Sequence, residues 1–212
     1  MLRSVLTDAV HGQSEIASSL CLMRVLPTMD LDDVTARIRE HYLEQFRAFI
    51  HEQKRGCTQG ASEVKLRLSE KSEVFQHLYC VDFIKNDGTA EIVELQPDRF
   101  LRFEPISGSL GGANLQVEAL RWDDLVIHHD APEPLSGIDP WFEQWFDPED
   151  KRRDEDAEFS GVIHSLLVRP DRLSIDFGSA PTTAFWTLLD LLEQEGAKSI
   201  RVSSSRDETE RE

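Results

Sequence analysis

The sequence predicts an α+β protein in which a mostly antiparallel sheet, built from successive hairpins, is accompanied by three helices. Two patterns indicate this class. In three segments, apolar residues recur every three or four positions, as on the buried face of a helix. Elsewhere, short runs alternate apolar and polar residues and are separated by turn sequences such as KNDGTA and QPDR, as in strands joined by hairpins.

The first helix is predicted over about 30–54. Its apolar stripe contains Leu31, Val34, Ile38, Tyr42, Phe46, Phe49 and Ile50. Acidic residues precede or open the segment and basic residues close it, which suits the helix dipole. We expect Gly56 to end the helix in the left-handed conformation.

Two shorter helices are predicted at about 140–146 and 181–195. The first lies in DPWFEQWFDPED, where Pro140 suits the first helical position and the second Asp-Pro ends the helix. The last helix has Pro181 in its first turn and Gly196 after its end.

The remaining elements are strands. LQVEALR and LVIHHD are predicted to pair through the turn WDD, and GVIHSLLV and RLSIDFG through Pro170-Asp171. GSLGG is interpreted as a long hairpin loop. Each of these two hairpins precedes a helix. This indicates either that a hairpin–helix unit has been duplicated, or only that similar turn sequences arose independently because they form good turns. We expect a single domain over 1–212 with one continuous sheet, whose sub-units would be divided by the charged segment 147–158. Segment 16–26 could be a strand or a short helix.

Composition excludes several classes of partner. The net charge is −17 and the pI is near 4.8, which argues against nucleic acid and against an anionic membrane surface. The charge is compatible with a basic protein partner, or simply with solubility. No apolar run is long enough to cross a bilayer, the N-terminal segment lacks a signal-peptide core, and the three cysteines form no CxxC motif. We therefore expect a cytoplasmic protein without a disulfide framework.

Few residues could carry chemistry. His128 and His129 adjoin Asp130, but neighbouring strand residues point to opposite faces. His164 and Asp176 could join them from the other hairpin, although no HxH or HExxH spacing is present. Asp82 and Asp176 lie in apolar strands, where a carboxylate is either buried with a raised pKa or on the solvent face, and alternation favours the solvent face for Asp176. We therefore expect no catalytic residue, metal or cofactor.

Charge and aromatic residues mark a binding candidate instead. Residues 130–158 contain eleven acidic and three basic residues, a balance of −8. In the adjoining helix, Trp141 and Trp145 share one face with two phenylalanines, which predicts either a plug in the core or an interface patch. The candidate partner-binding residues are Trp141, Trp145, Asp150, Asp154, Glu155 and Asp156.

These observations favour a non-enzymatic acidic binding protein. Small acidic α+β proteins without catalytic signatures include many bacterial immunity proteins, which neutralise toxins, although this is an analogy of general character without a residue motif behind it. The expected mechanism is stoichiometric inhibition, in which the acidic surface masks a basic partner. The alternatives are a structural or adaptor subunit that self-associates as a homodimer, and a hydrolase-like enzyme that uses a His/Asp cluster.

Overall fold

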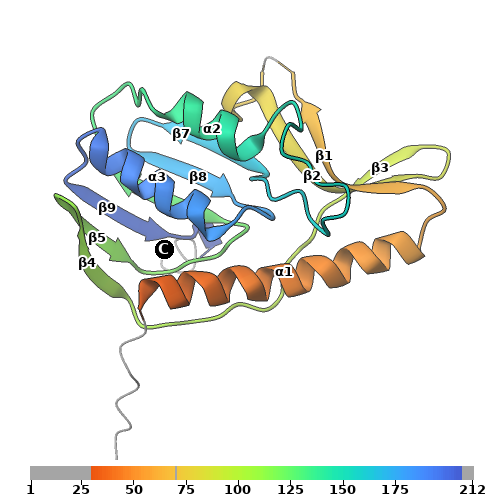
Figure 1. Ribbon diagram of the computed structural model, residues 1–212, viewed down its shortest axis with the longest axis horizontal. Helices are drawn as coiled ribbons and strands as arrows, with labels where there is room; N and C mark the ends of the chain where they lie inside the picture. The colour runs from red at the N-terminus through yellow and green to blue at the C-terminus, as the bar shows by residue number, and fades with distance from the viewer. Residues whose placement is uncertain (1–29, 70, 207–212) are drawn as a thin grey trace, which may run out of the picture.

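Helix α1 (Leu31–Arg55) runs along the lower side of the molecule, beside both of its sheets (Figure 1). The computed structural model describes residues 30–69 and 71–206, so segment 16–26 lies outside the described residues. The Asp30 side chain accepts a hydrogen bond from the Asp32 N–H, which caps the helix. Gly56 ends it as expected, but with φ −88° rather than in the left-handed conformation.

The strands form two sheets instead of the one continuous sheet expected. The smaller sheet is antiparallel and contains β1 (Gly60–Arg67), β2 (Leu78–Asn86) and β3 (Ala90–Val93) in that order. A short 3₁₀ helix, η1 (Phe75–His77), directly precedes β2. The connection from β3 then returns along α1 to the second sheet (Figure 1).

The larger sheet has six strands in the order β4-β5-β9-β6-β8-β7. They are β4 (Ile106–Leu110), β5 (Ala113–Val117), β6 (Leu125–His129), β7 (Ser165–Arg169), β8 (Arg172–Asp176) and β9 (Ser199–Ser203). All neighbours are antiparallel except β5 and β9. The predicted class, α+β with mostly antiparallel sheets, is confirmed.

Three predictions about strand pairing were wrong. QPDR joins no hairpin, because residues 94–105 form no strand and β3 and β4 belong to different sheets. β5 and β6 do not form a hairpin, because β9 lies between them and pairs with both. The sequence GSLGG is not a long loop: β4 continues to Leu110 and pairs with β5 around a tight turn at Gly111 and Gly112. The predicted hairpin of β7 and β8 is present.

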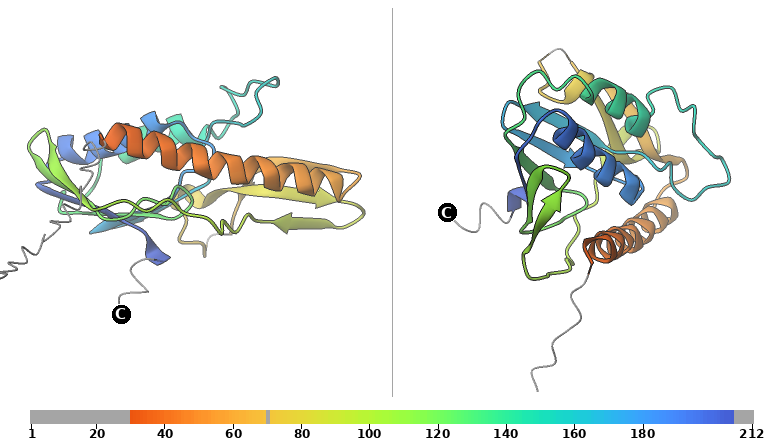
Figure 2. Two further views of the ribbon diagram at one scale, coloured as in Figure 1. Left: turned by 90° about the horizontal axis from the view of Figure 1, so that it is seen from below. Right: turned by 60° about the vertical axis from the view of Figure 1, so that its left-hand side comes forward.

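Helices α1, α2 (Ile138–Phe146) and α3 (Thr182–Gln194) all lie on the same side of the larger sheet (Figure 2). Of these, α2 and α3 pack against each other. The core between helices and sheets is rich in aromatic residues, and its largest fully buried side chains are Trp122, Phe46, Phe83, Phe142, Phe146, Phe177 and Phe185. No helix of the described segments combines the length and the apolar character needed to cross a membrane.

Candidate functional site

The aromatic helix α2 belongs to the core. Trp141 and Trp145 are 4% and 6% exposed. Both indole N–H groups donate to the Thr187 hydroxyl of α3, at 3.2 and 3.1 Å, and that of Trp141 also reaches the Ala184 carbonyl. The two tryptophans were candidate partner-binding residues, but burial against α3 leaves very little of their surface for a partner. Their polar atoms are also satisfied within the chain.

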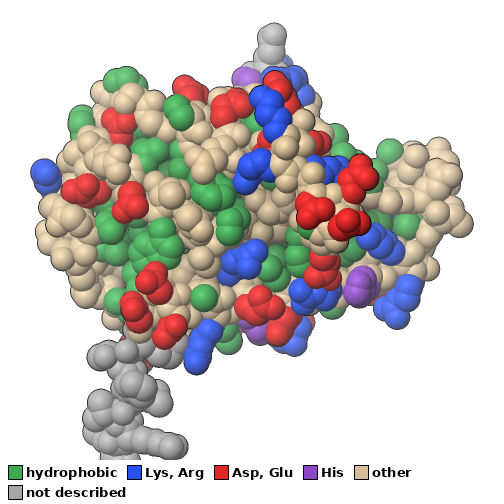
Figure 3. Space-filling view, in the orientation of Figure 1, with side chains coloured by type: hydrophobic (Ala, Val, Ile, Leu, Met, Phe, Trp, Pro, Cys, Tyr) green, Lys and Arg blue, Asp and Glu red, His purple; other side chains and the backbone are tan. Residues whose placement is uncertain are grey.

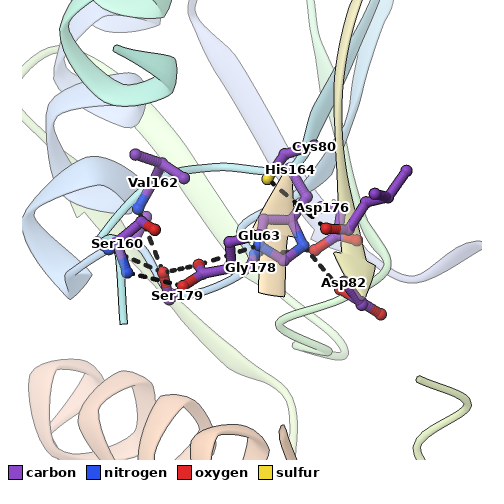
Figure 4. A network of polar contacts seen from close by, with 12 residues as sticks. Glu63, Cys80, Asp82, Ser160, Val162, His164, Asp176, Gly178 and Ser179 are labelled. Carbon is purple, nitrogen blue, oxygen red and sulfur yellow. Dashed lines mark hydrogen bonds and ion pairs between the residues drawn. The ribbon is translucent and has the colours of Figure 1, made fainter. Parts of the chain in front are cut away.

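The most unusual feature of the interior is a cluster of charged side chains centred on His164 (Figure 4). The imidazole is 1% exposed and lies between two carboxylates, Glu63 and Asp82, each 5% exposed. His164 Nε2 is 3.3 Å from Glu63 Oε1, and His164 Nδ1 is 2.9 Å from Asp82 Oδ1. The second contact has ion-pair distance without hydrogen-bond alignment, so the attraction there is electrostatic. A buried charge needs such partners.

The cluster lies where the two sheets meet. Glu63 belongs to β1 and Asp82 to β2, whereas His164 directly precedes β7. The main chain at His164 bridges the sheets, because its carbonyl accepts the Cys80 N–H and its own N–H donates to the Asp176 carbonyl, both at 2.8 Å. Both kinds of contact therefore connect the smaller sheet to the edge of the larger sheet at His164.

Glu63 reaches the interior because β1 is distorted at this residue. Its φ is 51°, a left-handed value inside a strand, and it interrupts the pairing register with β2 between Ser62 and Val64. Such a conformation costs about 1–3 kcal/mol for a residue other than glycine and persists only where its surroundings enforce it. Here the enforcing contacts are hydrogen bonds from the Ser179 hydroxyl to Oε1 and from the Ser160 N–H to Oε2, the latter at 2.7 Å.

Gly178 makes room for the imidazole. Its φ is +47°, and a Cβ at this position would lie 2.1 Å from His164 Cδ2. The Gly178 N–H donates to Asp176 Oδ1 at 2.8 Å. A side chain at Gly178 would therefore both strain the backbone and displace His164.

Burial and mutual contact set the charges of the cluster. Burial alone would lower the pKa of His164, but Cys80 and the carboxylates of Asp82 and Glu63 outweigh it and raise this pKa well above its usual value. Burial raises the pKa of the Cys80 thiol to about 12, so at neutral pH the carboxylates are what sustain the imidazolium. Burial would raise the pKa of Glu63, but contact with His164 lowers it. Burial raises the pKa of Asp176 to about 8 despite the nearby imidazolium, which keeps this carboxyl largely protonated at neutral pH.

This arrangement is an ion-paired junction between the two sheets. The Ser179 hydroxyl donates its hydrogen bond to Glu63 and not to the imidazole, unlike the serine of a Ser-His pair. The side chains of Glu63, Asp82 and His164 are all buried from solvent. Among residues 30–69 and 71–206, no group of His, Cys, Asp and Glu is arranged to hold a metal ion.

The histidines singled out in the sequence do not come together. His164 and Asp176 are neighbours in the cluster, a possibility that the sequence raised. The Asp176 carboxyl does not lie on the solvent face that alternation favoured. His128 lies near the C-terminal end of β6, away from the cluster, and is in register with Arg172 and Arg201. There it lines a concavity of about 460 Å³ together with Gln116 and Arg201. His129 is buried, and burial lowers its pKa.

The charged segment 147–158 projects from the body of the molecule (Figure 2, right). Every residue from Glu149 to Glu158 is exposed. Figure 3 shows acidic side chains grouped where this segment crosses the face in front of β1 and β2. The predicted binding residues Asp150, Asp154, Glu155 and Asp156 all lie within it.

Sequence reasoning missed Glu63 and Ser179 as members of the cluster. Glu63 occupies a polar position in an alternating strand, so its inward orientation left no signal in the sequence. His164 and Asp82 were visible as polar residues in apolar runs, but nothing fixed their proximity. Comparisons with protein-family models, curated protein sequences and solved structures found no match to this chain.

Proposed function

We propose that the protein is a non-enzymatic acidic binding protein, a stoichiometric inhibitor of the immunity-protein type that masks a basic protein partner. The observation that carries the proposal is the exposed acidic segment 149–158, which is held in place at both ends. The burial of the His164 cluster adds to it, because buried side chains are unsuited to handling a substrate.

The base of the segment is firmly anchored. Asp147 ends α2 in a left-handed conformation, and its carboxylate accepts the N–H groups of Lys151 and Arg152 at 3.0 and 2.9 Å. The Lys65 amine binds both the Asp147 carbonyl and the Asp150 carboxylate. Anchoring of this kind reduces the entropy lost when a loop is ordered by a partner.

The far end of the segment is also tied to the body. The Glu158 carboxylate accepts a hydrogen bond at 2.7 Å from Arg47 on α1. The pair is substantially exposed, so its contribution is small, on the order of 0–1 kcal/mol. Together with the base it fixes where the acidic tip is presented.

The tip itself consists of Asp154, Glu155 and Asp156. All three are exposed, and none of them forms an ion pair with another described residue. The Asp156 N–H donates to the Asp154 carboxylate at 3.0 Å, which turns the chain at this point. Three adjacent carboxylates on a chain of net charge −17 would attract a basic surface and accelerate its approach.

The test uses charge reversal at the tip with a matched control. The tip variant is Asp154→Lys, Glu155→Lys, Asp156→Lys. The control, Glu52→Lys, Glu91→Lys, Glu133→Lys, makes the same change in net charge at exposed positions elsewhere. Each full-length protein is immobilised, exposed to lysate of its own host at about 150 mM salt, and the bound proteins are identified and quantified by mass spectrometry. Any protein retained is then purified and its association rate with each variant measured.

The proposal requires one basic protein that binds at a ratio of 1:1 to the wild type and the control. Its association with the tip variant should be slower by at least about tenfold, because the charges at the point of first contact are reversed. Equal rates for the tip and control variants would contradict the role of the segment. Retention of no basic protein at low or moderate salt would contradict the function.

A further inference from the structure

Strand β4 is an outer strand of the larger sheet and has an unusual sequence for that position. Its outer edge has no partner strand among the described residues. Its sequence, Ile106-Ser107-Gly108-Ser109-Leu110, contains no charged residue. Natural proteins protect exposed edges with charges, proline or bulges, because an unprotected edge pairs readily with another chain.

The other outer strands of the described structure are protected by charge. β1 contains Lys65 and Arg67, β3 contains Glu91, and β7 ends in Arg169. β4 is thus the one outer strand in the described ranges without a charged side chain. The contrast is notable in a chain of which 30% is charged.

An apolar groove borders the same strand. It has a volume of about 560 Å³ and is lined by the half-buried side chains Leu31, Ile106, Leu110 and Trp186. Leu31 comes from the start of α1 and Trp186 from α3, so the groove lies between the helices and the sheet edge. Partly exposed apolar side chains beside an open edge provide a surface that a second element can bury.

We propose that β4 pairs antiparallel with β4 of a second copy of this chain, about a two-fold axis at Gly108. The sequence of the strand reads nearly the same in both directions. In this register Ile106 therefore faces Leu110 of the other copy, Ser107 faces its Ser109, and the two Gly108 residues face each other. A two-fold interface needs such self-complementarity. The two six-stranded sheets would become one continuous sheet. Ile106 and Leu110, at the ends of β4, would then lie beside the groove of each copy.

Gly108 suits the axis. Its φ lies outside the left-handed region, and a Cβ built there has no heavy atom within 4 Å. The position can therefore accept another residue without strain inside the monomer. The facing Cα atoms of an antiparallel pair lie about 4.5–5.5 Å apart, within the range that a disulfide spans.

Charge favours association at higher salt. Each copy carries a net charge of −17, and Asp30 lines the groove itself. At 0.1–0.15 M salt, repulsion between charges more than about 8–10 Å apart is largely screened. Salt hardly affects the backbone hydrogen bonds and apolar contacts of the proposed interface. The dimer should therefore strengthen as salt increases. Binding of a basic partner by segment 149–158 should weaken under the same change, so the two proposals fail separately.

The experiment places a thiol or a charge at the axis of the full-length protein. The thiol variant is Gly108→Cys with Cys21→Ser and Cys57→Ser, which leaves only the buried Cys80 of the native cysteines. Its control is Ile92→Cys in the same background, a position 52% exposed on the outer strand β3. Cross-linking under mild oxidation is measured on denaturing gels. Gly108→Lys, which sets two ammonium groups opposite each other, is compared with wild type by sedimentation equilibrium at 150 and 500 mM salt.

We expect the wild type to approach twice the 24.2 kDa of the chain as concentration rises, and more readily at 500 mM salt. Gly108→Lys should remain a monomer, and the thiol at 108 should cross-link at least about tenfold faster than that at 92. A wild type that is monomeric throughout, or a dimer that persists in Gly108→Lys, overturns the proposal. So does a variant retaining Cys21 in which the thiol at 108 joins Cys21 of the same chain, because residues 1–29 would then occupy the groove.

Discussion

Replacement of His164 by leucine tests the buried cluster most severely. Leucine fills most of the volume of the imidazole but removes its charge. Glu63 and Asp82, each 5% exposed, would then face each other without the cation between them. Removal of one partner from a buried ion pair typically destabilises a protein by about 3–5 kcal/mol.

The contacts that remain place the expected loss at the lower end of that range. Glu63 keeps its hydrogen bonds from Ser179 and Ser160, and Asp82 keeps the bond from the Leu95 N–H at 2.7 Å. Each carboxylate is thus partly solvated by the protein after the substitution. We expect His164→Leu to lower the free energy of unfolding by about 3 kcal/mol at pH 6.5, a large part of a typical total of about 5–15 kcal/mol.

The loss should depend on pH in a defined direction. The fold raises the pKa of His164, so its contribution is fully present below the unfolded value of about 6.5 and disappears as pH rises through the higher folded value. The difference between wild type and His164→Leu should therefore be largest near pH 6.5 and smaller at pH 9. A side chain that acted only by packing would give the same difference at both pH values.

Urea unfolding followed by tryptophan fluorescence at pH 6.5, 7.5 and 9 measures these differences. The control adds Glu63→Gln and Asp82→Asn to His164→Leu, which removes the unpaired charges. This triple variant should recover about 1–3 kcal/mol relative to His164→Leu alone. The reasoning is refuted if His164→Leu costs less than about 1 kcal/mol, or if the triple variant is no more stable than the single one.

Three further outcomes follow from the same contacts. Asp176→Asn should gain stability relative to wild type as pH rises from 5.5 to 8.5, because the fold holds a proton on Asp176 with a pKa of about 8 and asparagine needs none; a constant difference in urea midpoints would contradict this. Gly178→Ala should lose at least about 2 kcal/mol in the same assay, because the added methyl strains the left-handed backbone and meets His164, whereas Gly108→Ala, with open space, should cost less than about 1 kcal/mol. Thr187→Val should cost about 1–3 kcal/mol and alter the tryptophan emission, because two buried indoles lose their shared acceptor; an unchanged spectrum would argue against that contact.

The helices could be located from the sequence because their determinants are local. The predicted ranges 30–54, 140–146 and 181–195 correspond to Leu31–Arg55, Ile138–Phe146 and Thr182–Gln194. Apolar stripes and terminal residues specify these bounds within a few positions. The burial of Trp141 and Trp145 followed from the same stripe, as one of two alternatives.

The sheet pairing could not be located in this way. β9 follows β6 by about seventy residues yet pairs with it, because burial of Ile200 and Val202 in the core decides its place and leaves no local pattern. β4 was missed because its Ser and Gly residues resemble a loop in composition. The hairpin of β7 and β8 was predictable, because alternating apolar runs flank a recognisable Pro-Asp turn.

The buried cluster was the least predictable feature. Alternation placed Glu63 on the solvent side of β1, and only the left-handed backbone at this residue turns it inward. That backbone is held by residues more than ninety positions away, Ser160 and Ser179. A charged cluster assembled from strained and distant segments has no signature in a single sequence.

The central feature of the interior is His164 as a buried cation held by Glu63 and Asp82. Nuclear magnetic resonance of the protein with ¹⁵N-labelled histidine reports this directly, and His164→Leu identifies the signal by its absence. We predict that both ring nitrogens of His164 show imidazolium shifts at pH 7 and keep them to at least about pH 8, well beyond the ordinary value of about 6.5. Shifts of a neutral imidazole at pH 7 would contradict the charged junction and the stability predictions derived from it.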